Sequence, residues 1–494
     1  MNLHDLNIAV LGAGRSGRAA ARLAMKHGGR ACVFDTSQAI TGWPEDIPLH
    51  AGATQEDGHA FRADLVVISP GIETDCPFVK SFGREGVETI GEMELASRFY
   101  RGKIIAITGT NGKTTTTYLV EHIARVAGKR TGVIGTVGIR IGDEAEKSAH
   151  TTPESPDLQQ LFARMRDARC DVVAMEVSSH ALDLDRTWDA AFAVTAFSNL
   201  TQDHLDYHHT FEAYFEAKAR LFSKDYPAKR VICIDDKWGK ELLRRSSVAE
   251  DSVVTTGFDP SAQIHPVDVQ YAPTHTTVTL DVRGSLYTFD YPLVGRFNVE
   301  NIMCAFGIGL QLGFSADVVV EALEEAPQIP GRLERVNAPN TGGVSVFVDY
   351  AHTPDALEKA LASIMALTPG RTICVFGCGG DRDASKRPIM GRAALAADHA
   401  VVTSDNPRTE DPQAIIEDIV SGMGSGEGRF EVEADRRAAI ALAIAQAKAG
   451  DSILVAGKGH EDYQLVGDQV LSFDDRIVAA EELRRAFGDE PAAE

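Results

Sequence analysis

Residues 104–115 read Ile-Ile-Ala-Ile-Thr-Gly-Thr-Asn-Gly-Lys-Thr-Thr, and this stretch decides the class of fold. The apolar run predicts a buried strand, the glycines predict a turn, and the T-T-T-Y-L-V pattern that follows predicts a helix. Gly112-Lys113-Thr114 offers backbone amides and an ammonium for phosphate oxygens, and a hydroxyl for Mg²⁺. We therefore expect a phosphate loop that binds a nucleoside triphosphate, although Ile107 stands where the usual motif begins with glycine.

The alternation of an apolar strand, a polar turn and a helical pattern recurs in three blocks along the 494 residues. This alternation is typical of parallel α/β sheets, and the length suits about three domains. We expect a Rossmann-like domain over residues 1–100, a central P-loop domain over 101–330 and a second Rossmann-like domain over 331–494. Alternating Thr, Val and Tyr in residues 257–292 predict antiparallel strands within the central domain.

The charge balance limits the kinds of partner. With 49 Lys and Arg against 71 Asp and Glu, the net charge is −22, which repels nucleic acid and anionic membranes. The apolar runs are shorter than the roughly 20 residues of a membrane helix, and residues 1–7 do not resemble a signal peptide. Seven scattered cysteines give no disulfide or zinc pattern. We expect a cytoplasmic monomer that does not insert into membranes.

In the first block, Gly12-x-Gly14-x-x-Gly17 follows one predicted strand and Asp35 ends the next. This spacing fits a nucleotide-binding turn, in which backbone amides contact a phosphate and the acid contacts a ribose hydroxyl. The same glycines also fit a tight strand–helix turn without a ligand. The spacing does not distinguish a nicotinamide dinucleotide from another nucleotide.

In the central block, charged side chains follow two predicted strands. Glu176 lies at the end of the strand over residues 171–177, and a buried carboxylate favours a cation as its partner. Asp203 and His204 follow the next strand at the same sheet edge, although this pair also fits an ordinary surface loop.

Lys218 falls within the apolar stripe of the helix predicted for residues 211–222. Burial would favour its neutral amine, which can act as a nucleophile, form an imine or take up carbon dioxide as a carbamate. The alternative is a long side chain that extends to the surface.

In the third block, four predicted strands end in polar, glycine-bearing turns, at residues 349–355, 377–383, 405–408 and 457–461. The carboxyl ends of parallel strands share one sheet edge, so we expect these turns to form a binding crevice. The crevice is basic, because it contains Arg382, Lys386, Arg387 and Arg408. Since a guanidinium pairs well with a carboxylate, the crevice suits an anionic substrate.

Taken together, these motifs resemble the Mur ligase family of peptidoglycan precursor synthesis over essentially the whole chain. Residues 107–114 are similar to the family's own phosphate loop, which accounts for Ile107. The chain resembles the diaminopimelate-adding branch of the family in residues 151–154, 175–180, 199–208, 217–219, 377–390, 405–408 and 457–464. The first block instead resembles the uridine-binding domain of the D-glutamate-adding branch, in residues 12–17, 35–36, 69–72 and 90–95.

The resemblance implies ATP-dependent amide formation. The γ-carboxylate of D-glutamate in UDP-N-acetylmuramoyl-L-alanyl-D-glutamate would attack the γ-phosphate of ATP, and the amine of meso-diaminopimelate would then attack the acyl phosphate. The implied cofactors are ATP and Mg²⁺, with Lys218 converted to N6-carboxylysine. The implied catalytic residues are Lys113, Glu176, His204 and Lys218, and the implied metal ligands are Thr114, Glu176, His204 and the carbamate of Lys218.

The remaining implied contacts fall into three groups. ATP would lie against Gly109, Thr110, Asn111, Gly112, Lys113, Thr114, Thr115, Asn298, Asn301, Arg332, Asp349 and His352. The UDP precursor would lie against Arg15, Ser16, Asp35, Thr36, Gly71, Thr151, Thr152, Ser178 and Arg186. The amino acid would lie against Arg382, Asp405, Asn406, Arg408, Gly457 and Glu461. Among these, Arg408 would select the distal carboxylate that lysine lacks.

Three alternatives are open at this point. The first block also suits addition of D-glutamate to UDP-N-acetylmuramoyl-L-alanine. A nicotinamide-dependent dehydrogenase would use the turn at residues 12–17, but it would leave Lys113 and Lys218 without a role. A nucleotide-binding sensor that no longer catalyses would require a broken site, whereas Lys113, Glu176, His204 and Lys218 are all present.

Overall fold

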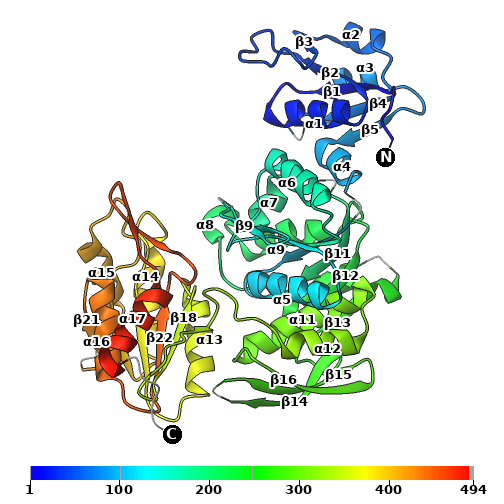
Figure 1. Cartoon of the computed structure of the whole chain (residues 1–494). Coiled ribbons are helices and arrows are strands. Elements are labelled where there is room, and N and C mark those ends of the chain that lie inside the picture. The colour runs from blue at the N-terminus through cyan, green and yellow to red at the C-terminus, as the bar shows by residue number, and fades with distance from the viewer. Residues whose placement is uncertain are drawn as a thin grey trace.

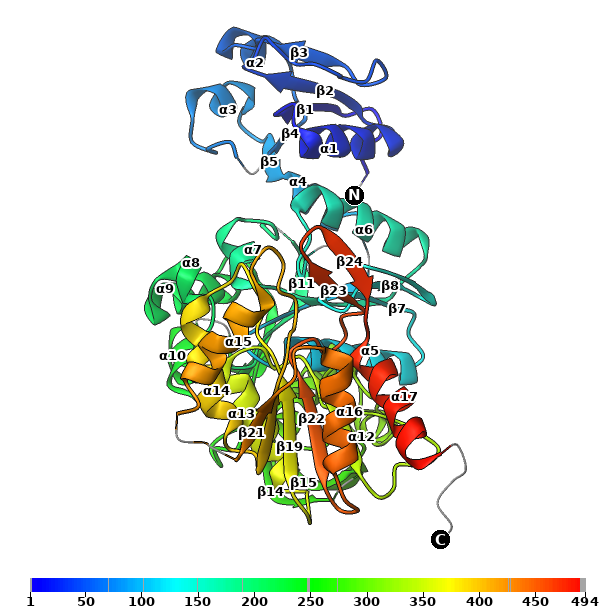
Figure 2. The same cartoon turned by 90° about the vertical axis from the view of Figure 1, so that its left-hand side faces the viewer.

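The computed structural model describes residues 2–488, apart from residues 70, 101, 149, 189, 247, 248, 273, 425 and 427. Three main sheets, covered by helices, form three α/β domains that follow one another along the chain (Figure 1). The first domain stands apart from the third, above the central domain, in both views (Figure 2). The predicted fold class is confirmed.

The first domain has a parallel sheet in the order β3-β2-β1-β4-β5, which is a Rossmann-type order. Helices cover both faces, so the apolar residues of β1 and β4 are buried, except for the partly buried Ile68. The elements are β1 (Asn7–Leu11), α1 (Arg15–Lys26), β2 (Arg30–Asp35), β3 (Leu49–Ala51), α2 (Gln55–Ala60), β4 (Leu65–Ile68), α3 (Pro77–Phe82), β5 (Glu88–Gly91) and α4 (Glu92–Ser97).

The central domain contains an eleven-stranded sheet in the order β16-β15-β14-β13-β12-β11-β6-β10-β7-β8-β9. Its middle strands are parallel, and β14, β15 and β16 are antiparallel, which confirms the prediction for residues 257–292. The strands are β6 (Lys103–Thr108), β7 (Thr131–Ile134), β8 (Ile139–Ile141), β9 (Glu144–Glu146), β10 (Val172–Glu176), β11 (Phe192–Phe197), β12 (Lys229–Cys233), β13 (Val253–Thr256), β14 (Ile264–Tyr271), β15 (Thr276–Val282) and β16 (Ser285–Tyr291). The helices are α5 (Lys113–Val126), α6 (Ser155–Asp167), α7 (Ser179–Asp183), α8 (Leu205–His208), α9 (Phe211–Ala219), α10 (Lys237–Arg245), α11 (Arg296–Leu312) and α12 (Ala316–Glu324).

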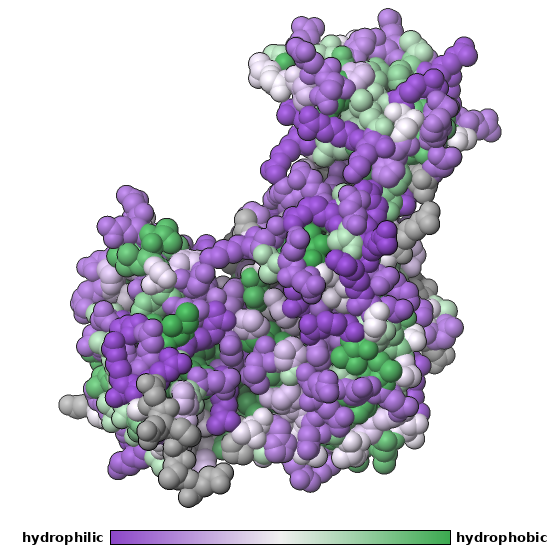
Figure 3. Space-filling model, in the orientation of Figure 1, coloured by the Kyte–Doolittle hydropathy of each residue, from purple (hydrophilic) through white to green (hydrophobic). Residues whose placement is uncertain are grey.

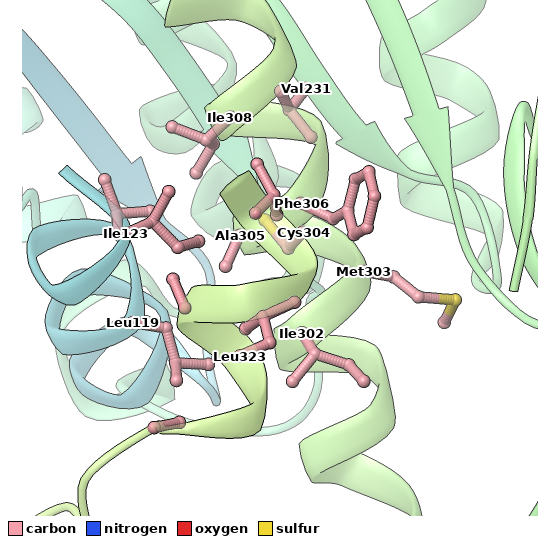
Figure 4. Close-up of a cluster of buried hydrophobic side chains, with 14 of the residues drawn as sticks. Leu119, Ile123, Val231, Ile302, Met303, Cys304, Ala305, Phe306, Ile308 and Leu323 are labelled. Carbon is pink, nitrogen blue, oxygen red and sulfur yellow. The ribbon is translucent and has the colours of Figure 1, made fainter. Parts of the chain in front are cut away.

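Two apolar cores hold this sheet from opposite faces. On one face, α5, α11 and α12 belong to one apolar cluster that includes Leu119, Phe306 and Leu323 (Figure 4). On the other face, α6 and α9 contribute Phe162 and Phe215. Each such side chain stabilises the fold by roughly 1.5–3 kcal/mol when fully buried. The strand ends that carry the predicted site are therefore held on a rigid support.

The third domain has a sheet in the order β17-β18-β22-β19-β20-β21, in which β17 alone of these strands runs antiparallel to its neighbour. The four predicted turns follow β18, β19, β20 and β22 at one edge, as expected. The strands are β17 (Glu334–Arg335), β18 (Ser345–Asp349), β19 (Thr372–Phe376), β20 (His399–Val402), β21 (Phe430–Val432), β22 (Ser452–Ala456), β23 (Tyr463–Val466) and β24 (Gln469–Ser472). The helices are α13 (Pro354–Met365), α14 (Arg387–Ala394), α15 (Pro412–Ser421), α16 (Arg436–Gln446) and α17 (Asp475–Phe487).

Hydrophilic side chains cover most of the face shown in Figure 3, which is hollowed between the first and third domains. Among the helices of the described residues, none is long and apolar enough to cross a membrane.

Candidate active site

The phosphate loop joins β6 to α5 at the carboxyl edge of the central sheet. Gly112 has a φ of 85°, and a Cβ at this position would lie 2.2 Å from Asn301 Oδ1, so the turn requires glycine. Asn301 is buried in α11, and its Nδ2 donates to Asn298 Oδ1 at 3.1 Å. The loop thus packs directly against the helix that carries two of the predicted ATP contacts.

Two lysines converge on one carbonyl of this loop. Lys113 Nζ donates to Gly109 O and Thr110 O, each at 2.9 Å, and Lys218 Nζ donates to Gly109 O at 2.8 Å. Lys218 is 1% exposed, so it does not extend to the surface. Burial, assisted by the charge of Lys113, holds the pKa of Lys218 well below its usual value. Burial therefore makes the neutral amine of Lys218 easier to reach than that of an exposed lysine.

Glu176 ends β10 and is 1% exposed. Thr114 Oγ1 lies 3.0 Å from both carboxylate oxygens, and Thr136 donates its N–H to Oε1 at 2.8 Å and its hydroxyl to Oε2 at 3.1 Å. These donors are uncharged, so the buried carboxylate remains a good partner for a cation. The sequence did not identify Thr136, which reaches Glu176 because β7 pairs with β10.

His204 follows β11 with a left-handed backbone, at a φ of 53°. Its Nε2 lies 3.4 Å from Asp203 Oδ2. Loss of hydration lowers the pKa of His204 to about 4, although the charge of Asp203 acts in the opposite direction. The imidazole is therefore neutral near pH 7 and has a lone pair available for a metal ion.

No three His, Cys, Asp or Glu side chains of the described chain form a metal site by themselves. Mg²⁺ does not require such a cluster, because it usually takes one or two carboxylates and fills its other positions with water and phosphate oxygens. Glu176 and the Thr114 hydroxyl beside it fit this pattern.

A cavity of about 560 Å³ lies between the central and third domains. Among the predicted site residues, it is lined by Thr110, Asn111, Gly112, Lys113, Thr114, Thr115, Thr151, Glu176, Ser178, His204, Asn301, Arg332, Asp349 and His352. The predicted ATP contacts Gly109 and Asn298 are not among its lining residues. Arg332 Nη2 donates to Thr114 Oγ1 at 3.0 Å, and burial raises the pKa of Asp349 to about 6. The structure therefore gathers most of the predicted ATP contacts around one cavity.

Asp355 of α13 connects the third domain to the phosphate loop. Its Oδ2 accepts hydrogen bonds from Asn111 Nδ2 and Thr201 Oγ1, each at 3.1 Å. The sequence placed Asp355 in a turn of the crevice but predicted no role for it, because Asn111 lies more than 200 residues earlier in the chain.

The predicted contacts for the UDP precursor form two clusters on different domains. Near the end of β10, Thr152 Oγ1 donates to Glu176 O at 2.9 Å, and Arg186 Nη1 donates to Thr152 O at 3.0 Å. Thr151 and Ser178 belong to the same cluster. The other five residues lie in the first domain, and they are Arg15, Ser16, Asp35, Thr36 and Gly71. Arg15 forms an ion pair with Asp157 of α6, across the boundary between the two domains.

In the first domain, Asp35 at the end of β2 is hydrogen-bonded to the glycine-rich turn. Asp35 accepts hydrogen bonds from Ala13 N at 2.7 Å and from Ser37 N at 2.8 Å. A Cβ on Gly17 would lie 1.9 Å from Gly12 O, so this glycine allows α1 to pack closely on β1. A nearby cavity of about 240 Å³ is lined by Ser69 and Glu92 of the first domain and by Trp188 of the central domain.

The predicted amino-acid contacts lie together at the edge of the third sheet. Asn406 Nδ2 donates to Glu461 Oε2 at 2.8 Å, and a Cβ on Gly457 would lie 2.5 Å from Asp405 Oδ2. Arg408 Nη1 donates to Gly380 O at 2.6 Å, and Arg382 flanks the same turn. Arg408 also has a φ of 53°, a strained conformation of the kind that gathers at binding sites.

Comparison with known protein families matches all three domains. The Mur ligase middle domain matches residues 107–309, and the glutamate ligase domain of Mur ligases matches residues 331–459. The MurD-like N-terminal domain of Mur ligases matches residues 6–91.

Individual proteins show the same likeness. The chain is 45% identical over 455 residues to the UDP-N-acetylmuramoyl-L-alanyl-D-glutamate–2,6-diaminopimelate ligase of Thermosynechococcus vestitus, covering 90% of this chain and 87% of that protein. The ligase of the same name from Gloeobacter violaceus is 43% identical over 465 residues, covering 90% of this chain and 93% of that protein. A solved structure under this name has a TM-score of 0.61 and 30% identity, covering 97% of this chain and 92% of the other.

Proposed function

Because this chain belongs to the Mur ligase family, we infer that it joins diaminopimelate to UDP-N-acetylmuramoyl-L-alanyl-D-glutamate in an ATP-dependent step of peptidoglycan synthesis. The two relatives carry this activity in their names and match the central and third domains, where the phosphate loop and the amino-acid contacts lie. The MurD-like first domain is compatible with the same reaction, since both nucleotide acceptors share a uridine.

The convergence of Lys113, Lys218 and Glu176 around the phosphate loop carries this proposal. The precursor's γ-carboxylate would attack the γ-phosphorus of ATP, which forms an acyl phosphate and releases ADP. The amine of diaminopimelate would then attack the acyl carbon, lose a proton and displace phosphate. Lys113 would exchange its contacts with Gly109 O and Thr110 O for phosphate oxygens.

Lys218 would act as a carbamate. Its neutral amine would add carbon dioxide and lose a proton. Of the two lysines beside Gly109 O, Lys113 would then stay a cation and Lys218 would become an anion. Thr114 and Glu176 would hold one Mg²⁺, and His204 and the carbamate would hold a second. Bound Mg²⁺ supplies positive charge against the phosphoryl oxygens.

One incubation tests the proposed activity. The protein receives ATP, Mg²⁺, UDP-N-acetylmuramoyl-L-alanine with D-glutamate, and UDP-N-acetylmuramoyl-L-alanyl-D-glutamate with diaminopimelate, and the products are resolved by mass. We expect the tripeptide nucleotide. A product formed solely from the alanyl precursor would instead support D-glutamate addition.

Replacement of Arg408 should affect the amino acid more than ATP. Arg408→Ala removes a guanidinium that we propose to pair with the distal carboxylate of diaminopimelate, and an unpaired buried carboxylate costs about 2–5 kcal/mol. We expect the KM for diaminopimelate to rise at least about tenfold, whereas the KM for ATP changes less than about twofold. Arg408→Lys should give an intermediate value, because it keeps the charge but not the two-pronged geometry. Equal increases in both KM values would contradict the assignment.

A further inference from the structure

Lys458 lies beneath the amino-acid cluster and belongs to none of the predicted contact groups. It follows β22 directly and is 0% exposed. Its Nζ donates to Tyr463 O, to Asn406 Oδ1 at 3.4 Å and to Glu461 Oε2 at 3.5 Å. The three donors of one buried ammonium thus contact three segments: the turn after β20, the turn after β22 and the hairpin β23–β24.

These segments form the walls of the amino-acid cluster, and the hairpin is bonded to the turn after β20 at several points. Leu465 N donates to Asn406 Oδ1 at 2.9 Å, Gln464 Nε2 donates to Asp405 O at 2.7 Å, and Arg408 N donates to Leu465 O at 3.0 Å. Lys458 therefore occupies the point where all three walls meet. Its removal would leave the oxygens of Asn406 and Glu461 with fewer buried donors, which is costly.

The charged side chains around Lys458 indicate which charge the pocket offers to a substrate. Asp405 is buried and the Glu461 side chain is 16% exposed, so two carboxylates lie in this cluster. Arg436 lies below them but is fully paired with Asp475, and both side chains are 0% exposed. Arg408 and Arg382 belong to the same cluster, and Arg408 is proposed to pair with the distal carboxylate of the substrate. Lys458 is the buried cation that contacts the Glu461 carboxylate directly, so it adjusts the negative charge that Asp405 and Glu461 offer to an ammonium group of a substrate.

We propose that Lys458 is a positioning residue, which orients Asn406 and Glu461 and sets the charge of the pocket that receives the distal ammonium of the amino-acid substrate. The proposal rests on the proposed function, because diaminopimelate carries a second ammonium at its distal end. Burial raises the pKa of Glu461 and the charge of Lys458 lowers it, which agrees with the role of Lys458 as its counter-ion.

The test compares diaminopimelate with 2-aminopimelate, which has the same chain and carboxylates but lacks the distal ammonium. In Lys458→Met, we expect the KM for diaminopimelate to rise at least about tenfold, while the KM for ATP stays within about twofold. The preference for diaminopimelate over 2-aminopimelate, measured as a ratio of kcat/KM, should fall by a similar factor. Acyl phosphate trapped with hydroxylamine, in the absence of amino acid, should form at close to the wild-type rate.

Two further variants control for a general effect on the third domain and for a failure of Lys458→Met to fold. Arg371→Met removes an ion pair with Asp451 at the opposite end of the same sheet, and it should leave the substrate preference unchanged. If Lys458→Met does not fold, Lys458→Arg replaces it, since arginine keeps the charge but places its donors differently, and the preference should still fall.

An unchanged preference in a folded variant, or equal increases in KM for ATP and diaminopimelate, would overturn the positioning role. A wild-type protein that does not ligate diaminopimelate at all would overturn the proposed function, so the two failures are distinguishable.

Discussion

Lys218→Ala is expected to lower the rate of ligation by about a thousandfold. The loss of one group that stabilises charge in a transition state typically has an effect of about this size. The substitution removes the amine that lies 2.8 Å from Gly109 O, and with it the site proposed for the carbamate. Amide formation is measured by chromatography of the nucleotide product. A small carboxylate such as formate should restore part of the activity, because it can occupy the space that the carbamate leaves.

Two control variants separate this role from the simple loss of a long basic side chain. Lys218→Arg keeps such a side chain but cannot form a carbamate, so it should be as inactive as the alanine variant. Lys224→Ala removes an exposed lysine shortly after the same helix and should retain full activity. Undiminished ligation by Lys218→Ala would rule out the carbamate.

The second large effect is expected on stability, at the ion pair between Arg436 and Asp475. Arg436 Nε and Nη2 donate to the two Asp475 oxygens at 2.8 and 2.7 Å, and Nη2 also donates to Ala456 O at 2.9 Å. Arg436→Met would leave the Asp475 carboxylate buried without a counter-ion. We expect the third domain to lose about 3–5 kcal/mol in its free energy of unfolding.

Hydrogen exchange of peptides from α16 and β22 is the appropriate measurement, because residues 331–494 contain no tryptophan. Arg437→Met is the matched control on the same helix. Arg437 pairs with Glu481 at the surface, and Glu482 keeps Arg485 as a partner at 2.9 Å. This control should lose less than about 1 kcal/mol. Similar protection in the Arg436 and Arg437 variants would show that the buried pair contributes little.

The sequence predicted those features that depend on local pattern. The alternation of strands and helices predicted the three α/β domains. The apolar stripe around Lys218 left burial and extension to the surface both open, and the structure shows that the side chain is buried. The rule that parallel strands end at one edge correctly grouped the four turns of the third domain. The functional roles assigned to these residues stay predictions.

Contacts that depend on the pairing of distant elements could not be predicted. Thr136 reaches Glu176 because β7 lies beside β10, and Asp355 reaches Asn111 because two domains meet. Lys458 was missed for a different reason: a lysine within a polar turn normally reaches solvent, and the hairpin β23–β24 that covers it is a tertiary feature. The hydrogen bonds that Asp35 accepts from Ala13 N in the glycine-rich turn and from Ser37 N could likewise not be predicted, and the ribose contact that its spacing suggested stays a prediction.

The attachment of the first domain has an evolutionary consequence. Its helices α1 and α4 pack against α6 of the central domain, and the Arg15–Asp157 pair lies at the same junction. The element contacts of this junction centre on α6, and the cavity beside it is lined by Trp188 of the central domain, whereas the phosphate loop lines the cavity between the central and third domains. Recombination between genes could therefore exchange the amino-terminal module while the machinery that forms the amide bond is inherited intact. In this chain the amino-terminal module matches the MurD-like domain over residues 6–91, while the likeness to a diaminopimelate ligase covers 90% of the chain.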